Sequence, residues 1–222
     1  MDADRLDEVR SRAEYQLDRV IHDAFFRGVS SGVFVDVGAA GPDRLSMSAM
    51  YRDIGWRVIA IEPNPVFCEA HRAAGHEIFE YACSDHEEDG AVFEVVDAHG
   101  AVYEGVPVSF ESYSALAIRD AYRALHPGDL DVRRITVNVR RLDSILAAHA
   151  PDVDRIDAVS IDVQGWELEV LAGFAVERYR PRVLIVENLF DEPAYVRTLG
   201  SRGYRLWRRV GPNDVYVPIS NL

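Results

Sequence analysis

The sequence feature that most constrains the fold is an apolar run that ends in an acid and small residues, Val33-Phe34-Val35-Asp36-Val37-Gly38-Ala39-Ala40-Gly41. Its β-branched residues predict a buried strand, and its glycines and alanines predict a tight turn into a helix. Folds that bind nucleotide-type cofactors use such a strand–turn–helix, because small residues let the ligand approach the backbone near the helix N-terminus. A turn that needs glycine only for its own geometry explains the same residues equally well.

A second predicted strand also ends at an acid. Residues 57–61 (Arg-Val-Ile-Ala-Ile) are predicted to form this mainly apolar strand, and Glu62-Pro63-Asn64-Pro65 follows, where the prolines prevent the strand from continuing. Glu62 lies some two dozen residues after Asp36, close to the interval of about 20 at which dinucleotide-binding folds place an acid on the ribose hydroxyls. We therefore expect Glu62 to bind a ribose, the alternative being a solvated carboxylate in a turn.

The rest of the chain alternates between helical and strand periodicity. We expect helices at 6–25, 43–54, 66–74, 119–125, 142–146, 164–173 and 192–199, and further strands at 77–82, 91–96, 106–110, 133–139, 156–163, 181–186, 204–209 and 214–217. Successive βαβ units predict an α/β fold with one mostly parallel, doubly wound sheet. Gly211-Pro212 predicts an antiparallel hairpin at its C-terminal edge.

The length and the hydrophobic content suit a single domain over residues 1–222. Residues 1–28 are expected to form a helical cover, because the helix at 6–25 carries one apolar stripe. That stripe can cover the sheet, close the mouth of a site or join two copies as a homodimer. Residues 86–130 interrupt the α/β pattern, and we interpret them as an insertion that shapes the substrate site.

Acidic and amide side chains follow two core strands at the place where a ligand would bind. Asp162 ends the strand at 156–163, and Glu187 and Asn188 follow the strand at 181–186. Because open α/β sheets bind ligands beyond the carboxyl ends of their strands, we expect these three side chains to converge. Like charges at short range raise each other's pKa unless a cation intervenes, and hard oxygen ligands favour Mg²⁺. The alternative is that they cap helices or accept backbone N–H bonds.

The composition limits the partners and the chemistry. A formal charge of −13 repels phosphate and anionic lipid, so neither nucleic acid nor membrane is an expected partner. All 24 basic residues are arginine, which excludes a lysine Schiff base and a phosphate-loop lysine. With only Cys68 and Cys83, no apolar leader and no apolar run of membrane-spanning length, the chain is expected to be cytoplasmic.

The seven histidines do not stand in a zinc-binding spacing. His99 lies in the insertion and His126 in a loop, where either is a candidate general base, although a surface histidine is the commoner role for each. No Gly-x-Ser-x-Gly elbow lies between a predicted strand and a following helix, as a serine hydrolase would require.

Five motifs, taken in order, resemble the FkbM family of S-adenosylmethionine-dependent methyltransferases. They are Asp36-Val-Gly-Ala-Ala-Gly41, Ile61-Glu-Pro-Asn-Pro65, Ala82-Cys-Ser-Asp85, Arg141-Leu-Asp-Ser-Ile-Leu146 and Ile161-Asp-Val-Gln-Gly-Trp-Glu-Leu-Glu-Val-Leu171. The resemblance covers residues 33–217 and implies a Rossmann-like class I methyltransferase fold. The better-known activities of the family are O-methylations of sugar or polyketide hydroxyls in natural products and glycans.

The resemblance also assigns residues to the cofactor, S-adenosylmethionine. The methionine and ribose region would be lined by Asp36, Gly38 and Ala40. Glu62 would bind the ribose hydroxyls with Asn64 beside it, and the adenine would lie by Ser84 and Asp85. Ala40 stands where the family usually has asparagine, and Pro42 after the glycine is unusual.

Metal-dependent O-methyltransferases of this fold take ligands from positions similar to Asp162, Glu187 and Asn188. The resemblance therefore implies Mg²⁺ at these three residues, with Asp162, Glu187 and His126 as the catalytic candidates. The expected function is Mg²⁺-assisted transfer of a methyl group from S-adenosylmethionine to a hydroxyl of a sugar or oligosaccharide.

Two other functions are compatible with parts of the sequence. An NAD-dependent short-chain oxidoreductase shares the strand–turn–helix and the ribose acid, but a chain without lysine cannot supply its Tyr-x-x-x-Lys pair. A non-catalytic module of the same fold that binds a sugar or nucleotide is the third alternative. Acids at the ends of adjacent strands argue against it.

Overall fold

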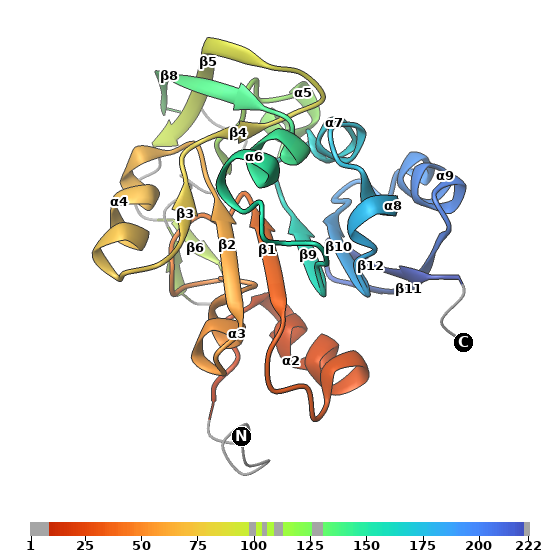
Figure 1. The fold of residues 1–222 in the computed structure, drawn as a ribbon. Coiled ribbons are helices and arrows are strands. Elements are labelled where there is room, and N and C mark those ends of the chain that lie inside the picture. Colours follow the sequence, from red (N-terminus) through yellow and green to blue (C-terminus); the bar gives the residue numbers. More distant parts are fainter. Residues whose placement is uncertain (1–8, 98–100, 104–105, 109–112, 126–130, 220–222) are drawn as a thin grey trace.

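Seven strands form the central sheet, and the computed structural model describes residues 9–97, 101–103, 106–108, 113–125 and 131–219 (Figure 1). The strand order is β11-β12-β10-β9-β1-β2-β3, parallel from β3 to β10, with β12 antiparallel to both neighbours. The strands of this sheet are β1 Val33–Val37, β2 Arg57–Ile61, β3 Ile78–Phe79, β9 Ala158–Ile161, β10 Val183–Glu187, β11 Tyr204–Val210 and β12 Asn213–Pro218. The predicted doubly wound sheet and its C-terminal hairpin are confirmed.

Helices cover both faces of this sheet. Val35 and Ile161 point to the face covered by α6, α7, α8 and α9, whereas Phe34 and Ile185 point to the face covered by α2 and α3. The covering helices are α2 Leu17–Ile21, α3 Ala49–Asp53, α6 Leu142–His149, α7 Glu167–Ala172, α8 Val176–Tyr179 and α9 Pro193–Ser201. Strands buried on both faces need apolar residues at successive positions, which is why the core strands are nearly continuous apolar runs in the sequence.

The N-terminal helix predicted at 6–25 is shorter and interrupted. Its described part consists of η1 Glu14–Gln16, α2 and η2 His22–Phe26. Tyr15 and Gln16 have left-handed φ angles of 51° and 53°, which end a right-handed helix. Asp18 is the cause, because its buried carboxylate accepts the backbone N–H of Arg12 at 3.0 Å and thereby turns the preceding segment back on the helix.

The helix predicted at 43–54 is also shorter than expected and is confined to α3. The loop before it is held open by Arg52, whose guanidinium donates to the Pro42 carbonyl at 2.7 Å and to the Ser48 hydroxyl at 2.8 Å. Leu45 in this loop has a φ of 54°, which a right-handed helix does not accommodate. Helix propensity is therefore overridden by side-chain hydrogen bonds to the loop.

Some predicted strands belong to a second sheet instead of the central one. The run predicted as one strand at 77–82 divides into two. Ile78 and Phe79 form β3 and pair with β2, whereas Ala82 and Cys83 pair with residues 139 and 140 in another sheet. The second sheet has the order β4-β8-β5 and lies above the ends of β1 and β2 in Figure 1. The remaining described elements are α4 Pro65–Ala73, β4 Ala82–Cys83, β5 Glu88–Asp97, β6 Ala101–Tyr103, β7 Val106–Val108, α5 Asp120–Arg123 and β8 Asp131–Arg140. Local periodicity does not reveal strand partners, because tertiary contacts decide them.

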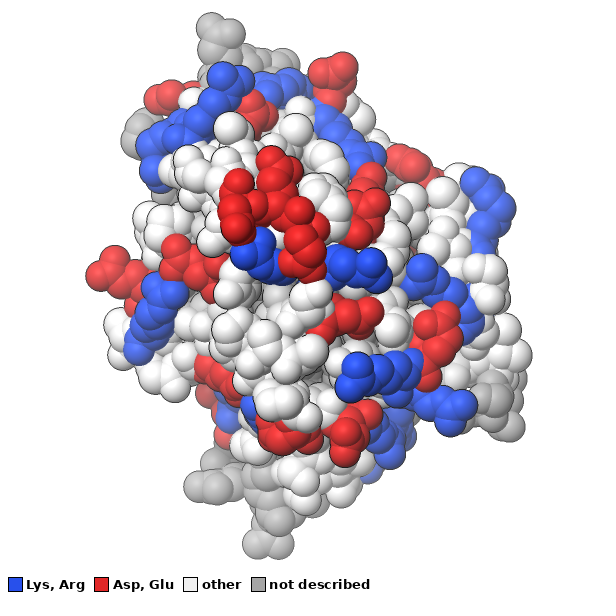
Figure 2. Space-filling view, turned by 45° about the horizontal axis from the view of Figure 1, so that its top comes forward, with Lys and Arg blue, Asp and Glu red and all other residues white. Residues whose placement is uncertain are grey.

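Charged side chains of both signs are interspersed on the face shown in Figure 2, with no continuous basic area on that face. On the second sheet, Arg140 forms an ion pair with Asp89 at 2.5 Å, and Arg134 forms one with Glu94 at 3.2 Å. Among the described helices, none combines the length and the apolar character that crossing a bilayer requires.

Candidate functional site

A pocket of about 500 Å³, its open mouth included, lies where the ends of β1 and β2 meet the second sheet. Its walls are mostly apolar and aromatic, with Phe67, Tyr81, Phe93, Leu116 and Trp166 among the lining residues. The turn after β1 contributes Gly38 and Ala40, and the polar side chains are those of Glu62, Ser114 and Asp162. This lining is typical of a small-molecule site, at the position where open α/β sheets bind their ligands.

Gly38 is required by the packing of two strand ends. Its φ is 78°, and a Cβ at this position would lie 1.8 Å from the carbonyl oxygen of Asp162. Its backbone N–H also donates to the Ile61 carbonyl at 2.9 Å. The geometry of the turn thus accounts for this glycine, and it brings the loop after β1 into contact with the loop after β9.

Glu62 is fixed against the turn after β1. Its two carboxylate oxygens accept the backbone N–H of Ala40 at 3.0 Å and that of Asn64 at 2.8 Å. Burial raises the pKa of Glu62 to about 7, the charge of Asp36 acts in the same direction, and the two N–H donors oppose the shift. The pocket therefore contains an oriented carboxyl group that titrates near neutral pH.

Several residues that the sequence assigned to a cofactor do not line this pocket. Asp36 is buried on β1, where it is hydrogen-bonded to Ser48, and burial raises its pKa. Asn64 caps α4 by accepting the Val66 N–H at 3.1 Å. Ser84 is buried, and Asp85 is exposed and pairs with His86, while their neighbours Ala82 and Cys83 line the pocket instead.

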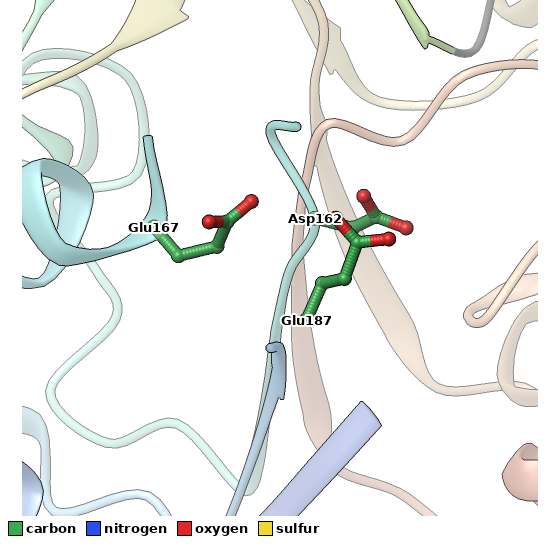
Figure 3. A group of neighbouring side chains, drawn as sticks. All are labelled: Asp162, Glu167 and Glu187. Carbon is green, nitrogen blue, oxygen red and sulfur yellow. The ribbon is translucent and has the colours of Figure 1, made fainter. Parts of the chain in front are cut away.

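Three carboxyl groups converge beside the pocket. Asp162 follows β9, Glu187 ends β10 and Glu167 begins α7, and one oxygen of each lies within 4.8 Å of the others (Figure 3). Asp162 accepts the amide of Gln164 at 2.6 Å, and Glu187 accepts the hydroxyl of Tyr122 at 3.1 Å. Because Asp162 also lines the pocket, it connects this carboxyl group cluster to the ligand space.

Burial and mutual repulsion keep protons on this cluster. Burial raises the pKa of Asp162 to about 7, and the charge of Glu167 contributes. The pKa of Glu187 is raised well above its ordinary value by burial and by the charges of Asp162 and Glu167. A cluster of this kind either takes up a proton near neutral pH or holds a cation.

Asn188, expected as a third metal ligand, is engaged elsewhere. Its amide donates to Asp214 at 2.8 Å, and its side-chain oxygen accepts the Glu192 N–H at 2.8 Å. Asp214 is buried and needs a donor, so Asn188 supplies one while ordering the turn before α9. The structure therefore brings Asp162 and Glu187 together but turns Asn188 away from them.

Glu167 takes the third position, and its own oxygens are already hydrogen-bonded. One oxygen accepts the N–H groups of Val163 at 3.0 Å and Gly165 at 2.9 Å, and the other accepts the Tyr195 hydroxyl at 2.8 Å. In the sequence Glu167 is only an acid in the first turn of a helix, which is a common structural role. The main role of Glu167 is therefore to hold the loop after β9 in place, and it is a weaker candidate for a metal ligand than Asp162 or Glu187.

We expect Tyr195→Phe to lower the free energy of unfolding by about 1–3 kcal/mol at pH 8, because it leaves a buried carboxylate oxygen of Glu167 without its donor. Urea denaturation measures this loss. The matched control is Tyr204→Phe, whose hydroxyl donates to the neutral carbonyl of Pro181 at 2.9 Å. If the loss is no larger than that of the control, the Glu167 carboxylate needs its hydroxyl donor no more than a neutral carbonyl does.

Helix α5 and the residues just before it also reach the site. Tyr122 packs so closely on Gly165 that a Cβ there would lie 2.7 Å from its ring, and its hydroxyl binds Glu187. Trp166 donates to the Ala117 carbonyl at 3.0 Å. His99 and His126, the candidate general bases, lie outside the described residues.

Comparison with known proteins assigns the family. The sequence model of the methyltransferase FkbM domain matches residues 36–206, which is most of the chain. None of the curated proteins compared with this sequence matches it. The match begins at the end of β1 and includes the pocket and the carboxyl group cluster, in agreement with the motifs found in the sequence. The chain therefore belongs to the FkbM methyltransferase family.

Proposed function

We propose that this protein is an S-adenosylmethionine-dependent O-methyltransferase that acts on a hydroxyl of a sugar or oligosaccharide. The observation that carries the proposal is the position of Asp162, which both lines the pocket and belongs to the carboxyl group cluster. A methyl donor in the pocket would therefore have a proton acceptor beside it. Family membership supports methyl transfer over the oxidoreductase alternative.

The donor is expected to bind between the turn after β1 and Glu62. A carboxylate accepts hydrogen bonds from both hydroxyls of a ribose, and Glu62 is held toward the pocket by the N–H groups of Ala40 and Asn64. The aromatic and apolar walls suit an adenine ring. The resemblance places the motif at residues 82–85 beside the adenine. Of these residues, Ala82 and Cys83 on β4 line the pocket, so they are our candidates for the contact with adenine in place of Ser84 and Asp85.

Methyl transfer requires an in-line arrangement of three atoms and the removal of one proton. The acceptor oxygen attacks the methyl carbon, the carbon–sulfur bond breaks, and its electron pair remains on sulfur. The hydroxyl proton passes to the Asp162 carboxylate. In the site without metal, a base with a pKa of about 7 is well matched to this task at neutral pH.

The residues present also suit Mg²⁺, which binds through one or two carboxylates together with water and substrate oxygens. Asp162 and Glu187 each use one oxygen for a hydrogen bond within the protein, and their other oxygens would hold the ion. Glu167 would add negative charge without ligating, because its two oxygens already accept three hydrogen bonds. The chemistry that bound Mg²⁺ supplies is a lower pKa of the acceptor hydroxyl.

We expect Mg²⁺ to raise turnover by about tenfold or more over the same enzyme in excess EDTA, through this effect on the acceptor hydroxyl. Formation of S-adenosylhomocysteine with a cognate acceptor measures it. Mn²⁺ should restore the activity, while Na⁺ at equal ionic strength serves as the control. Full turnover in EDTA would contradict a role for Mg²⁺ in the reaction, and Asp162 would then act as the base without a metal ion.

The acceptor is expected to be neutral. A protein with a formal charge of −13 and an acidic site repels anionic substrates, whereas sugar hydroxyls carry no charge. The direct test is a screen of mono- and oligosaccharides for S-adenosylhomocysteine formation, with and without Mg²⁺. Calorimetry separates the alternatives: binding of S-adenosylmethionine supports the proposal, whereas binding of NAD would support the oxidoreductase. Donor binding without turnover on any acceptor class would favour a non-catalytic module.

A further inference from the structure

Helix α4 packs against two of the loops that line the pocket, the loop after β1 and the loop after β2. Cys68 and His71 lie three residues apart on one face of this helix, and both are fully buried. The Cys68 thiol donates to the Glu62 carbonyl at 3.0 Å, and Nε2 of His71 lies 3.1 Å from the carbonyl oxygen of Ala40. One helix face thus contacts the loop after β1 and the loop after β2.

The surroundings of His71 fix its protonation. A carbonyl oxygen only accepts hydrogen bonds, so Nε2 of His71 carries the hydrogen that the Ala40 carbonyl receives. Nδ1 of His71 then accepts from Nδ1 of His76 at 3.3 Å. Burial, followed by the charge of Arg52, lowers the pKa of His71 to about 4, while the nearby Asp43 opposes this shift. The ring is therefore neutral at physiological pH.

Ala40 is the residue that this contact restrains. Its φ is 45°, a left-handed conformation that alanine rarely adopts. In this conformation its carbonyl accepts from His71 while its N–H donates to Glu62 at 3.0 Å. Without His71, nothing described on the α4 side holds the Ala40 carbonyl, and a return to an ordinary φ would remove one of the two donors that orient Glu62.

We propose that His71 is a positioning residue of the methyl-donor site. His71 holds Ala40 in its left-handed conformation and thereby keeps Glu62 directed at the donor ribose. His76 orients the ring of His71 in this arrangement. The inference rests on the proposed function, because it takes S-adenosylmethionine as the ligand of the pocket. His71 does not line the pocket, so its influence passes through Ala40.

The test is calorimetric titration of the full chain with S-adenosylhomocysteine at pH 8. His71→Phe should weaken binding by about tenfold, the scale of one lost hydrogen bond and one unsatisfied buried carbonyl. His71→Gln should bind within about threefold of the natural protein, because its amide nitrogen can donate from the place of Nε2. His22→Phe is the matched control, since His22 is also buried but packs near Tyr51, away from these loops.

A second readout separates positioning from loss of structure. Glu62 is surrounded by the N–H groups of Ala40 and Asn64, by Cys68 and by the charge of Asp36. Removing the Ala40 donor should raise the pKa of Glu62, so the pH below which binding weakens should move upward in His71→Phe and stay in place in His22→Phe. If His71→Phe does not fold, His76→Ala supplies the measurement, with an expected loss of about threefold.

The outcomes distinguish this inference from the function on which it rests. A natural protein that does not bind S-adenosylhomocysteine would overturn both. Binding by the natural protein with equal affinity and an equal pH profile in His71→Phe would overturn only the role of His71. Recovery of both affinity and pH profile in His71→Gln supports that role.

Discussion

Replacing Asp162 with asparagine is expected to lower kcat by about 10²–10⁴-fold, the range lost with a general base, while S-adenosylhomocysteine still binds. Asparagine keeps the shape of the side chain and still accepts the Gln164 amide, which the natural residue receives at 2.6 Å. It cannot accept the hydroxyl proton and is a weaker ligand for a divalent cation. Turnover and calorimetry on the same preparation measure the two effects separately.

The control for this variant is Asp89→Asn, which removes a carboxylate with a 78% exposed side chain. It lowers the acidic charge of the protein equally but lies on β5, outside the carboxyl group cluster, so kcat should stay at the natural value. An Asp162→Asn enzyme that turns over at the natural rate would show that another group takes the proton.

Stability provides an independent measure of the same variant. Because the pKa of Asp162 is raised to about 7 in the folded protein, its ionisation costs folding free energy. This cost is absent below about pH 4, grows as the pH rises and is complete above pH 7. Without divalent metal, Asp162→Asn should therefore have a higher Tm than the natural protein at pH 8, and the gain should vanish near pH 4.

The parts of the fold that the sequence predicts well are those that burial dictates. The core strands are nearly continuous apolar runs because the sheet is covered on both faces, and the turn signals between them are local. The parts it misses depend on single side chains that act at a distance. Asp18 turns the N-terminal segment, and Arg52 opens the loop before α3. No apolar periodicity records such bonds.

The candidate site divides in the same way. Glu62, Asp162 and Glu187 are predictable because the carboxyl ends of parallel strands share one edge of a sheet. Glu167 is brought to Asp162 by a turn in which Gln164 and Gly165 have φ angles of 56° and 93°. Asn188 is held away from the cluster by its hydrogen bond to Asp214, a buried acid on β12 that is distant in sequence. Both effects are tertiary, so strand ends alone do not reveal them.

The pH dependence of donor binding is expected to follow Glu62. Its pKa is about 7 in the free protein, and the ribose hydroxyls donate to the ionised form, so binding favours loss of the proton. The Kd for S-adenosylhomocysteine should be constant above pH 8 and should rise as the pH falls through 7, by up to about tenfold per pH unit. Calorimetry in buffers of different ionisation enthalpy should detect the released proton.

Glu62→Gln should remove this dependence and weaken binding at pH 8 by about 10–100-fold, the scale of hydrogen bonds to a charged group. Glutamine presents one oxygen and one nitrogen to the two backbone donors of Ala40 and Asn64, so one N–H is left facing another donor. Asp162 lines the same pocket and also titrates near 7, so it is the competing source of any pH effect. The decisive control is therefore Asp162→Asn. If Glu62 governs donor binding, this variant keeps the natural pH dependence of the Kd. Loss of that dependence in Asp162→Asn would instead assign it to the titration of Asp162.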